Sequence, residues 1–178
     1  AVEEAETTLL KACTDLEDDS FYRVTEQSIG MYNYCASSAM GLNSISYFNS
    51  TMNGLILEFD QLMGNGRSCM VYQSDFNNRT ILNALAAVKY YGSTDDETAE
   101  AFLPYGYQLY DEKRIDDTGY TVYKTEDTLP LAYSYERVMS QDELLAHPVE
   151  ERQELLLKNA VVEDTDVLTG TYDVAQHA

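Results

Sequence analysis

Residues 81–91 read ILNALAAVKYY, and this step from a helix pattern into a strand pattern constrains the fold more than any other part of the chain. Ile81, Leu82 and Leu85 are apolar residues at the spacing of a helix turn. Val88 to Tyr91 is β-branched and aromatic, which is typical of a strand. A short helix that leads directly into a strand predicts a sheet with helices packed on it.

Four other segments have strand-like composition. They are residues 21–26, 105–115, 120–127 and 131–139. Asp116-Asp117-Thr118-Gly119 separates two of them and is a typical hairpin turn sequence. We therefore predict an α/β fold in which these four strands and the one at 88–91 form one mixed sheet. An α+β arrangement is the alternative.

Helices are predicted before, between and after these strands in the sequence. Residues 4–16 place Leu9, Cys13 and Leu16 on one face, and residues 55–63 form a second predicted helix. Ser140 and Glu143 match a capping box, and Pro148 suits the first turn of a last helix. The sequence has no internal repeat and no linker, so we expect a single domain over 1–178 with a polar tail at 165–178.

The charge of the chain excludes one class of partner. It has 31 acidic and 11 basic residues, a net charge of −20. Phosphate backbones and anionic lipid surfaces repel such a chain, so nucleic acid is not an expected partner. No apolar run reaches the roughly 18 residues that a membrane-spanning helix needs. We expect a soluble piece of a longer protein.

Catalytic chemistry has little support in the sequence. His147 precedes a proline at a helix start and His177 lies in the predicted tail, so neither is placed as a catalytic base. The adjacent acidic pairs, Asp18-Asp19 among them, fall in turns where solvation explains them. The three cysteines have no zinc-site spacing and are expected to be small buried side chains. We predict no catalytic residue, no metal site and no cofactor.

Tyrosine is the most unusual feature of the composition, with 15 tyrosines and no tryptophan. Tyrosine packs on sheet faces and also binds polar ligands. Packing between strands is one interpretation, and a sugar-binding cleft is the other. The tyrosines considered for such a cleft are Tyr32, Tyr34, Tyr47, Tyr90, Tyr91, Tyr105, Tyr107, Tyr110, Tyr133 and Tyr135.

The segment 27–54 is the predicted place for such a cleft. It is long, rich in Asn, Ser and Tyr, and too polar to be core throughout. We predict that it folds over the strand ends near 88–91, although packing filler or disorder is the alternative. The predicted binding residues are Tyr32, Tyr34, Asn43, Tyr47, Asn49, Asn53, Tyr90 and Tyr91.

Five stretches occur in an order that resembles a known family. They are DDSFYRVTE, GLNSISYFNSTMN, ILNALAAVKYYGST, GYTVYKTEDTLPLAYSYERV and RQELLLKNAVVED. Together they cover about residues 18–164 and resemble the extracytoplasmic region of the YfhO family of bacterial membrane proteins. In that family the helix-to-strand step is a scaffold element and not an active site.

The resemblance implies a function for a larger protein. Such proteins are similar to multi-spanning glycosyltransferases that use a lipid-phosphate sugar and modify cell-wall polymers such as lipoteichoic acid. The chain would be a non-catalytic domain on the extracellular face of the bacterial plasma membrane. Its partners would be the transmembrane part of the same parent chain and a cell-wall glycan or polymer. A structural or protein-interaction domain without glycan affinity is the alternative.

Overall fold

The computed structural model describes residues 13, 16–26, 41–51, 53–65, 71–73, 75–93, 101–110 and 121–163. The chain divides into two compact units, residues 1–133 and residues 134–178. Both units combine strands with helices, and they are described separately below. The prediction of a single domain over 1–178 stays a prediction.

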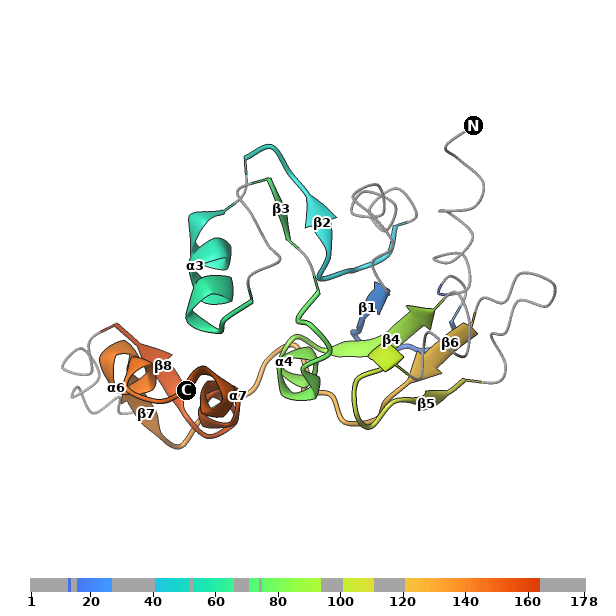
Figure 1. Cartoon of the computed structure of the whole chain (residues 1–178). Helices are drawn as coiled ribbons and strands as arrows, with labels where there is room; N and C mark the ends of the chain where they lie inside the picture. Colours follow the sequence, from blue (N-terminus) through green and yellow to red (C-terminus); the bar gives the residue numbers. More distant parts are fainter. Residues whose placement is uncertain are drawn as a thin grey trace, which may run out of the picture. The chain divides into compact units, whose positions relative to one another are not determined.

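A four-stranded mixed sheet is the centre of the first unit (Figure 1). Its order is β1-β4-β6-β5, formed by Arg23–Glu26, Val88–Ser93, Thr121–Lys124 and Gln108–Leu109. The pair β1 and β4 is parallel, whereas β6 runs antiparallel to both β4 and β5. This sheet confirms the predicted α/β class and four of the five predicted strands. The turn at 116–119 and the helix at 4–16, apart from Cys13 and Leu16, lie outside the described residues.

The helix-to-strand step has the predicted form. Two residues separate helix α4, Thr80–Leu85, from the start of β4. Ala87 lies between them with a φ of 55°, a left-handed conformation that turns the chain abruptly from helix into strand. Figure 1 shows α4 at the start of β4.

A smaller layer belongs to the same unit. Strands β2, Tyr47–Phe48, and β3, Tyr72–Gln73, form an antiparallel pair. Helix α3, Gly54–Leu62, follows β2 and matches the helix predicted at 55–63. The buried Asp60 of α3 accepts hydrogen bonds from Asn65 Nδ2 (3.2 Å) and Gln73 Nε2 (3.4 Å), which fastens the helix to β3.

Alternation along the strands gives the four-stranded sheet two aromatic faces. On one face Val24, Tyr90 and Val122 pack with Cys13 and Leu16. On the other face lie three tyrosines, with Leu103 packed against them. They are Tyr91, Tyr107 and Tyr123. Tyr90, Tyr91, Tyr107 and Tyr123 are therefore part of the core, which agrees with the packing interpretation for these rings.

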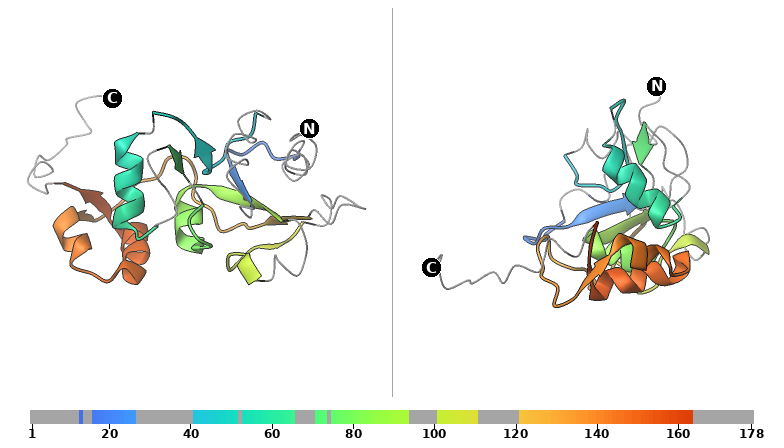
Figure 2. Two further views of the ribbon diagram at one scale, coloured as in Figure 1. Left: turned by 45° about the horizontal axis from the view of Figure 1, so that its top comes forward. Right: turned by 90° about the vertical axis from the view of Figure 1, so that its left-hand side faces the viewer.

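The second unit contains a separate sheet. Strand β7, Val138–Ser140, pairs in parallel with β8, Ala160–Val162 (Figure 2). Two helices connect these strands along the chain, α6, Gln141–Leu145, and α7, Val149–Lys158. The capping box is present, because Ser140 Oγ accepts from Glu143 N and the Glu143 carboxylate accepts from Ser140 N. No helix in the described part of the chain combines the length and apolar character needed to span a bilayer.

The prediction that residues 131–139 join the central sheet is wrong. Of this segment only Val138 and Met139 are in a strand, and that strand pairs with β8. Thr125 N still bonds to Lys89 O, but residues 130–134 beyond it are exposed and not in any strand. Pro130 lacks an N–H group for a sheet ladder, and the apolar Ala160–Val162 segment supplies β7 with a partner inside its own unit.

Candidate functional site

A cleft beside β5 and β6 is the candidate site. Its volume is about 260 Å³. Its lining comes from the turn before β5, from β5 itself and from the end of β6. The lining residues are Gly106, Gln108, Leu109, Tyr110, Lys124, Glu126 and Asp127, and we call this the β5–β6 cleft.

The turn that enters the cleft is fastened to the body of the unit. Thr80 Oγ1 donates to Tyr105 O (2.9 Å), which ties the turn to the start of α4. The Tyr107 hydroxyl donates to Val88 O (2.6 Å) beneath the turn. Burial raises the pKa of Tyr107, so this hydroxyl stays protonated and keeps donating. These two bonds hold the rim of the cleft.

Lys124 and Glu126 form an ion pair in the cleft. Lys124 Nζ lies 2.6 Å from Glu126 Oε1 and 5.8 Å from the centre of the Tyr110 ring. The hydrogen bond to Glu126 raises the pKa of Lys124, and the bond from Lys124 lowers the pKa of Glu126. Glu126 is 75% exposed, so solvent screens the pair and its contribution to stability is small.

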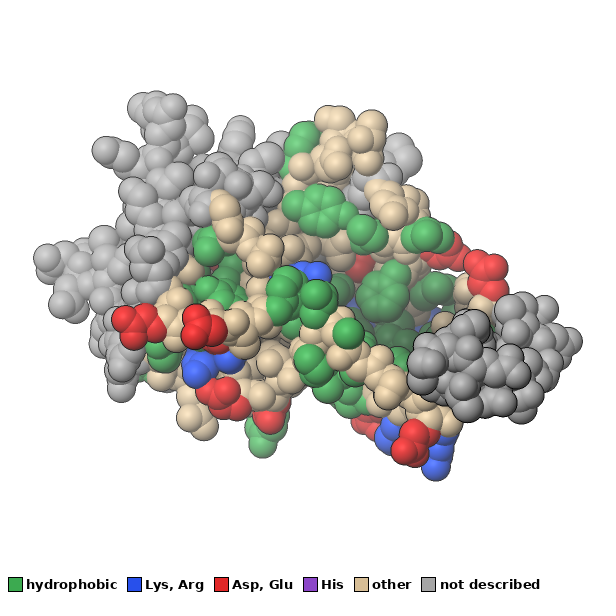
Figure 3. Space-filling model, turned by 180° about the vertical axis from the view of Figure 1, so that it is seen from behind, with side chains coloured by type: hydrophobic (Ala, Val, Ile, Leu, Met, Phe, Trp, Pro, Cys, Tyr) green, Lys and Arg blue, Asp and Glu red, His purple; other side chains and the backbone are tan. Residues whose placement is uncertain are grey.

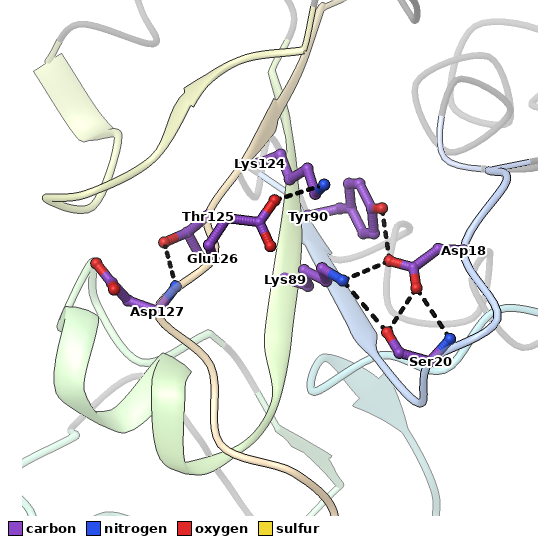
Figure 4. Close-up of polar contacts among 8 residues, drawn as sticks. All are labelled: Asp18, Ser20, Lys89, Tyr90, Lys124, Thr125, Glu126 and Asp127. Carbon is purple, nitrogen blue, oxygen red and sulfur yellow. Dashed lines mark hydrogen bonds and ion pairs between the residues drawn. The ribbon is translucent and has the colours of Figure 1, made fainter.

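A second polar group adjoins the cleft, and we call it the Asp18 cluster (Figure 4). Asp18 Oδ2 lies 2.6 Å from Lys89 Nζ and accepts from the Tyr90 hydroxyl at 2.8 Å. Asp18 Oδ1 accepts from Ser20 N at 2.9 Å and from Ser20 Oγ at 2.5 Å. Lys89 also donates to Ser20 Oγ at 3.2 Å. The side chains of Asp18 and Lys89 are only 10% and 14% exposed.

The Asp18 cluster holds its carboxylate in the charged form. Burial alone would raise the pKa of Asp18, but the hydrogen bonds from Lys89, Ser20 and Tyr90 outweigh it and hold the pKa below its ordinary value. Burial, together with the bond to Asp18, raises the pKa of Tyr90. At neutral pH the Asp18 carboxylate is therefore charged and the Tyr90 phenol is neutral.

Aromatic rings join the cluster to the cleft. Tyr90 faces Lys124 across β4 and β6, and its ring lies 5.8 Å from that of Tyr110 in an edge-on arrangement. Tyr22 packs on the other side of Tyr90 at 4.9 Å. The site thus combines one amide, two carboxylates, a lysine and a part-buried ring. Such groups bind hydroxyls through hydrogen bonds and ring faces.

Gly106 is the residue of the cleft whose backbone conformation restricts which side chain can occupy its position. Its φ is 90°, and a Cβ atom there would lie 3.4 Å from Asp127 Oδ2 and 3.8 Å from Thr125 Oγ1. We expect Gly106→Ala to lower the free energy of unfolding by about 1–2 kcal/mol, because alanine is strained in left-handed backbone. Urea unfolding followed by circular dichroism measures the change.

Two other glycines serve as controls for Gly106→Ala. Gly41 has a φ of 72° but nothing within 4 Å of an added Cβ, so Gly41→Ala reports strain without the contact. Gly54 begins α3 with open space around it, and Gly54→Ala is expected to be neutral or slightly stabilising. A Gly106→Ala variant as stable as Gly54→Ala would contradict the prediction.

The predicted binding residues lie in several different places. Tyr90 and Tyr91 are buried, at 1% and 2% exposure, on opposite faces of the sheet. Asn49 Oδ1 accepts from Thr51 N and Oγ1, and Asn53 Oδ1 caps α3 by accepting from Leu55 N.

Of the four remaining predicted residues, the structure describes two. Asn43 is exposed, Tyr47 is half-buried, and Tyr32 and Tyr34 lie outside the described residues. Among the described members of the set, only Tyr90 adjoins the β5–β6 cleft, through its contact with Tyr110. Whether the set binds a ligand stays a prediction.

Sequence reasoning missed most of the β5–β6 cleft. Tyr110 is one of the tyrosines that the composition suggests for a sugar cleft, but the sequence pattern places Gln108, Lys124 and Glu126 only in predicted strands. Asp18 was assigned to a solvated turn and is instead largely buried against Lys89. No group of three or more His, Cys, Asp or Glu that could hold a metal ion occurs within the described ranges.

The comparisons with known proteins give one match. The family model described as "Bacterial membrane protein YfhO" matches residues 3–177. This is the family that the five motifs indicated over about 18–164, and the match extends beyond that range at both ends. No curated protein and no solved structure matches the chain.

Proposed function

Because the chain belongs to the YfhO family of bacterial membrane proteins, we propose that it is a non-catalytic outer domain that binds a carbohydrate acceptor. The parent protein is proposed to be a multi-spanning glycosyltransferase that uses a lipid-phosphate sugar on the extracellular face of the plasma membrane. Its product would be a glycosylated cell-wall polymer such as lipoteichoic acid. The transmembrane part of the parent chain would carry the catalytic residues.

The composition of the β5–β6 cleft is the observation that carries this proposal. Gln108, Glu126 and Asp127 offer hydrogen-bonding groups beside the Tyr110 ring. The volume of about 260 Å³ is below the roughly 300–1,000 Å³ of sites that enclose a drug-sized ligand. A cleft of that size suits one unit of a polymer that continues beyond it.

The charges in the site favour a neutral unit over a phosphate. Lys124 of the cleft is paired with Glu126, and Lys89 of the adjoining Asp18 cluster is paired with Asp18, so both lysines are already neutralised. Around them the chain has a net charge of −20. A phosphate would therefore meet repulsion, whereas sugar hydroxyls would meet amide, carboxylate and ring. We propose that the cleft contacts the sugar or polyol part of the acceptor.

Truncation of the Gln108 side chain tests the cleft. Gln108 is exposed, so Gln108→Ala removes hydrogen bonds to a ligand without disturbing the core. We expect it to weaken the binding of neutral glycans by about tenfold, equivalent to roughly 1.4 kcal/mol. Amide chemical shifts recorded during titration with simple glycans and with lipoteichoic acid fragments give the affinity and the residues that respond.

Asn43→Ala is the matched control, because it removes an exposed amide from a predicted binding residue outside the cleft. Loss of binding in Asn43→Ala with full binding in Gln108→Ala would move the site to the predicted 27–54 segment. If saturating glycan shifts neither region, acceptor binding is refuted.

The alternative function is a structural or protein-interaction domain without glycan affinity. The observation that favours it is the burial of Tyr90, Tyr91, Tyr107 and Tyr123 in the two faces of the sheet, where they stabilise the fold and are not available to a ligand. The glycan titration separates the two proposals, since this domain would show no shifts with any carbohydrate.

A further inference from the structure

The part of the chain that forms β2 and the start of α3 lacks charged side chains. No Asp, Glu, Lys or Arg occurs anywhere from residue 27 to residue 57, although charged residues are 24% of the sequence. The first acid after this stretch is Glu58, one helix turn beyond Leu55, and Asp60 is buried. Residues 27–57, which include β2 and the start of α3, are therefore an uncharged stretch of a strongly negative protein, and the exposed Glu58 follows them directly.

Three apolar side chains are exposed on the layer formed by β2, β3 and α3. Phe48 at the end of β2 is 44% exposed, Leu55 in the first turn of α3 is 68% exposed and Val71 beside β3 is 37% exposed. Phe48 and Val71 are neighbours, because Phe48 pairs with Tyr72 and Asn49 N bonds to Val71 O at 2.8 Å. We call Phe48, Leu55 and Val71 the apolar tip.

Several polar groups between these side chains are hydrogen-bonded within the protein. Asn49 Oδ1 accepts from Thr51 N and Oγ1, at 3.0 and 3.2 Å. Asn53 Oδ1 accepts from Leu55 N at 3.0 Å, and Ile56 N bonds to Asn53 O at 3.1 Å. Backbone groups that are already bonded cost less to remove from water. The connection from β2 to α3 is thus suited to a less polar environment.

From these observations we infer that the apolar tip rests in the headgroup region of the bilayer to which the parent protein belongs. A chain with net charge −20 is repelled by anionic lipid, so an uncharged region is the part that approaches a membrane most closely. Figure 3 shows green and tan side chains together at the top of the described surface.

The inference rests on attachment to a membrane, as in the proposed function, but does not depend on acceptor binding. Three part-exposed side chains bury little area, and even one acyl chain gives only marginal membrane affinity. A second anchor is therefore required, which the membrane-spanning part of the parent would supply. The tip would then fix the orientation of the domain above the bilayer.

The absence of tryptophan makes a clean experiment possible. Phe48→Trp places a single indole in the apolar tip, and Tyr105→Trp places one at a 90% exposed position of the same unit. Each 178-residue variant carries a terminal hexahistidine tag and is anchored to phosphatidylcholine vesicles that contain a nickel-chelating lipid. Fluorescence is recorded with ordinary lipid and with lipid brominated on its acyl chains, and no glycan is present.

We expect the indole in Phe48→Trp to shift to the blue and to be quenched by brominated lipid at least about twofold more than the indole in Tyr105→Trp. Adding Leu55→Asp to Phe48→Trp is expected to abolish both effects, because it places a charge in the tip. Equal quenching of the two probes, in variants whose circular dichroism matches the parent chain, would overturn the inference. A blue shift that needs no vesicles and rises with protein concentration would also overturn it, and would assign the tip to a second copy of the chain.

Discussion

Replacing Tyr91 with alanine is expected to lower the free energy of unfolding by about 3–5 kcal/mol, the range for truncating a large buried aromatic side chain. Tyr91 is 2% exposed and lies in the middle of β4. Its ring is 6.2 Å from that of Tyr107 at an interplanar angle of 68°. Tyr91 is also paired with Tyr123 of the neighbouring strand β6. The three rings form one aromatic face of the sheet, so alanine would leave a cavity that its neighbours cannot fill.

Two variants and a local measurement make this prediction specific. Tyr91→Phe keeps the ring and removes only the hydroxyl, so its cost should be about 0.5–1.5 kcal/mol. Tyr105→Ala makes the same truncation at a 90% exposed position and should change stability by less than about 0.5 kcal/mol. Hydrogen exchange should accelerate in β4 and β6 but not in α7, which belongs to the other unit. An alanine variant no less stable than Tyr91→Phe would contradict the prediction.

The central sheet was predictable because its signals are local. The apolar spacing at 81–85 and the β-branched and aromatic run at 88–91 are contiguous, and each forms the element that its own residues favour. The capping box at Ser140 and Glu143 is local in the same sense, since both hydrogen bonds close within one helix turn. Helices and strands that are specified by residues close together in the sequence can be predicted without knowing what they pack against.

The strand predicted at 131–139 failed because strand pairing is a long-range property. The segment Leu131 to Met139 has enough aromatic and apolar residues for a strand, but composition does not specify the partner. In the structure β7 pairs with β8, more than twenty residues later in the sequence. Nothing in the local pattern distinguishes that partner from β6, which comes just before the segment.

The candidate site could not be predicted for the same reason, because its contacts join residues that are far apart in the sequence. Asp18 and Lys89 are 71 positions apart, and their 2.6 Å contact exists only because β1 lies beside β4. Lys124 ends β6 and Glu126 lies two residues beyond it, the spacing of any solvated residues along an extended chain. The only usable signal was the tyrosine content, and that pointed equally to the buried Tyr91 and to Tyr110 at the cleft. A sheet can assemble a polar site from residues that are ordinary in sequence.

Replacing Asp18 with asparagine is expected to lower the free energy of unfolding by about 2–4 kcal/mol at neutral pH. The variant would leave Lys89 charged and 14% exposed, without its counter-ion, and would weaken the bonds from Ser20 and Tyr90. Glu126→Gln is the matched control, because it breaks an ion pair of equal length whose acid is 75% exposed and should cost less than about 1 kcal/mol.

A double-mutant cycle separates the ion pair from the other effects of Asp18→Asn. Lys89→Met removes the charge that the variant leaves unpaired while keeping most of the side-chain volume. The double variant should therefore be more stable than the sum of the two single changes predicts, by about 1–3 kcal/mol. Additive changes would show that Lys89 contributes nothing to the role of Asp18.

The dependence on pH gives an independent test of the charge on Asp18. Its folded-state pKa lies below the ordinary value, so its stabilising contribution is complete above the unfolded pKa of about 4 and is lost as pH falls toward the folded pKa. The stability difference between the parent chain and Asp18→Asn should thus be constant from about pH 5 to 7 and shrink as pH falls below about 4. Urea unfolding of both proteins across this range measures the difference. A difference that grows on acidification would mean that the Asp18 carboxyl is protonated in the folded state.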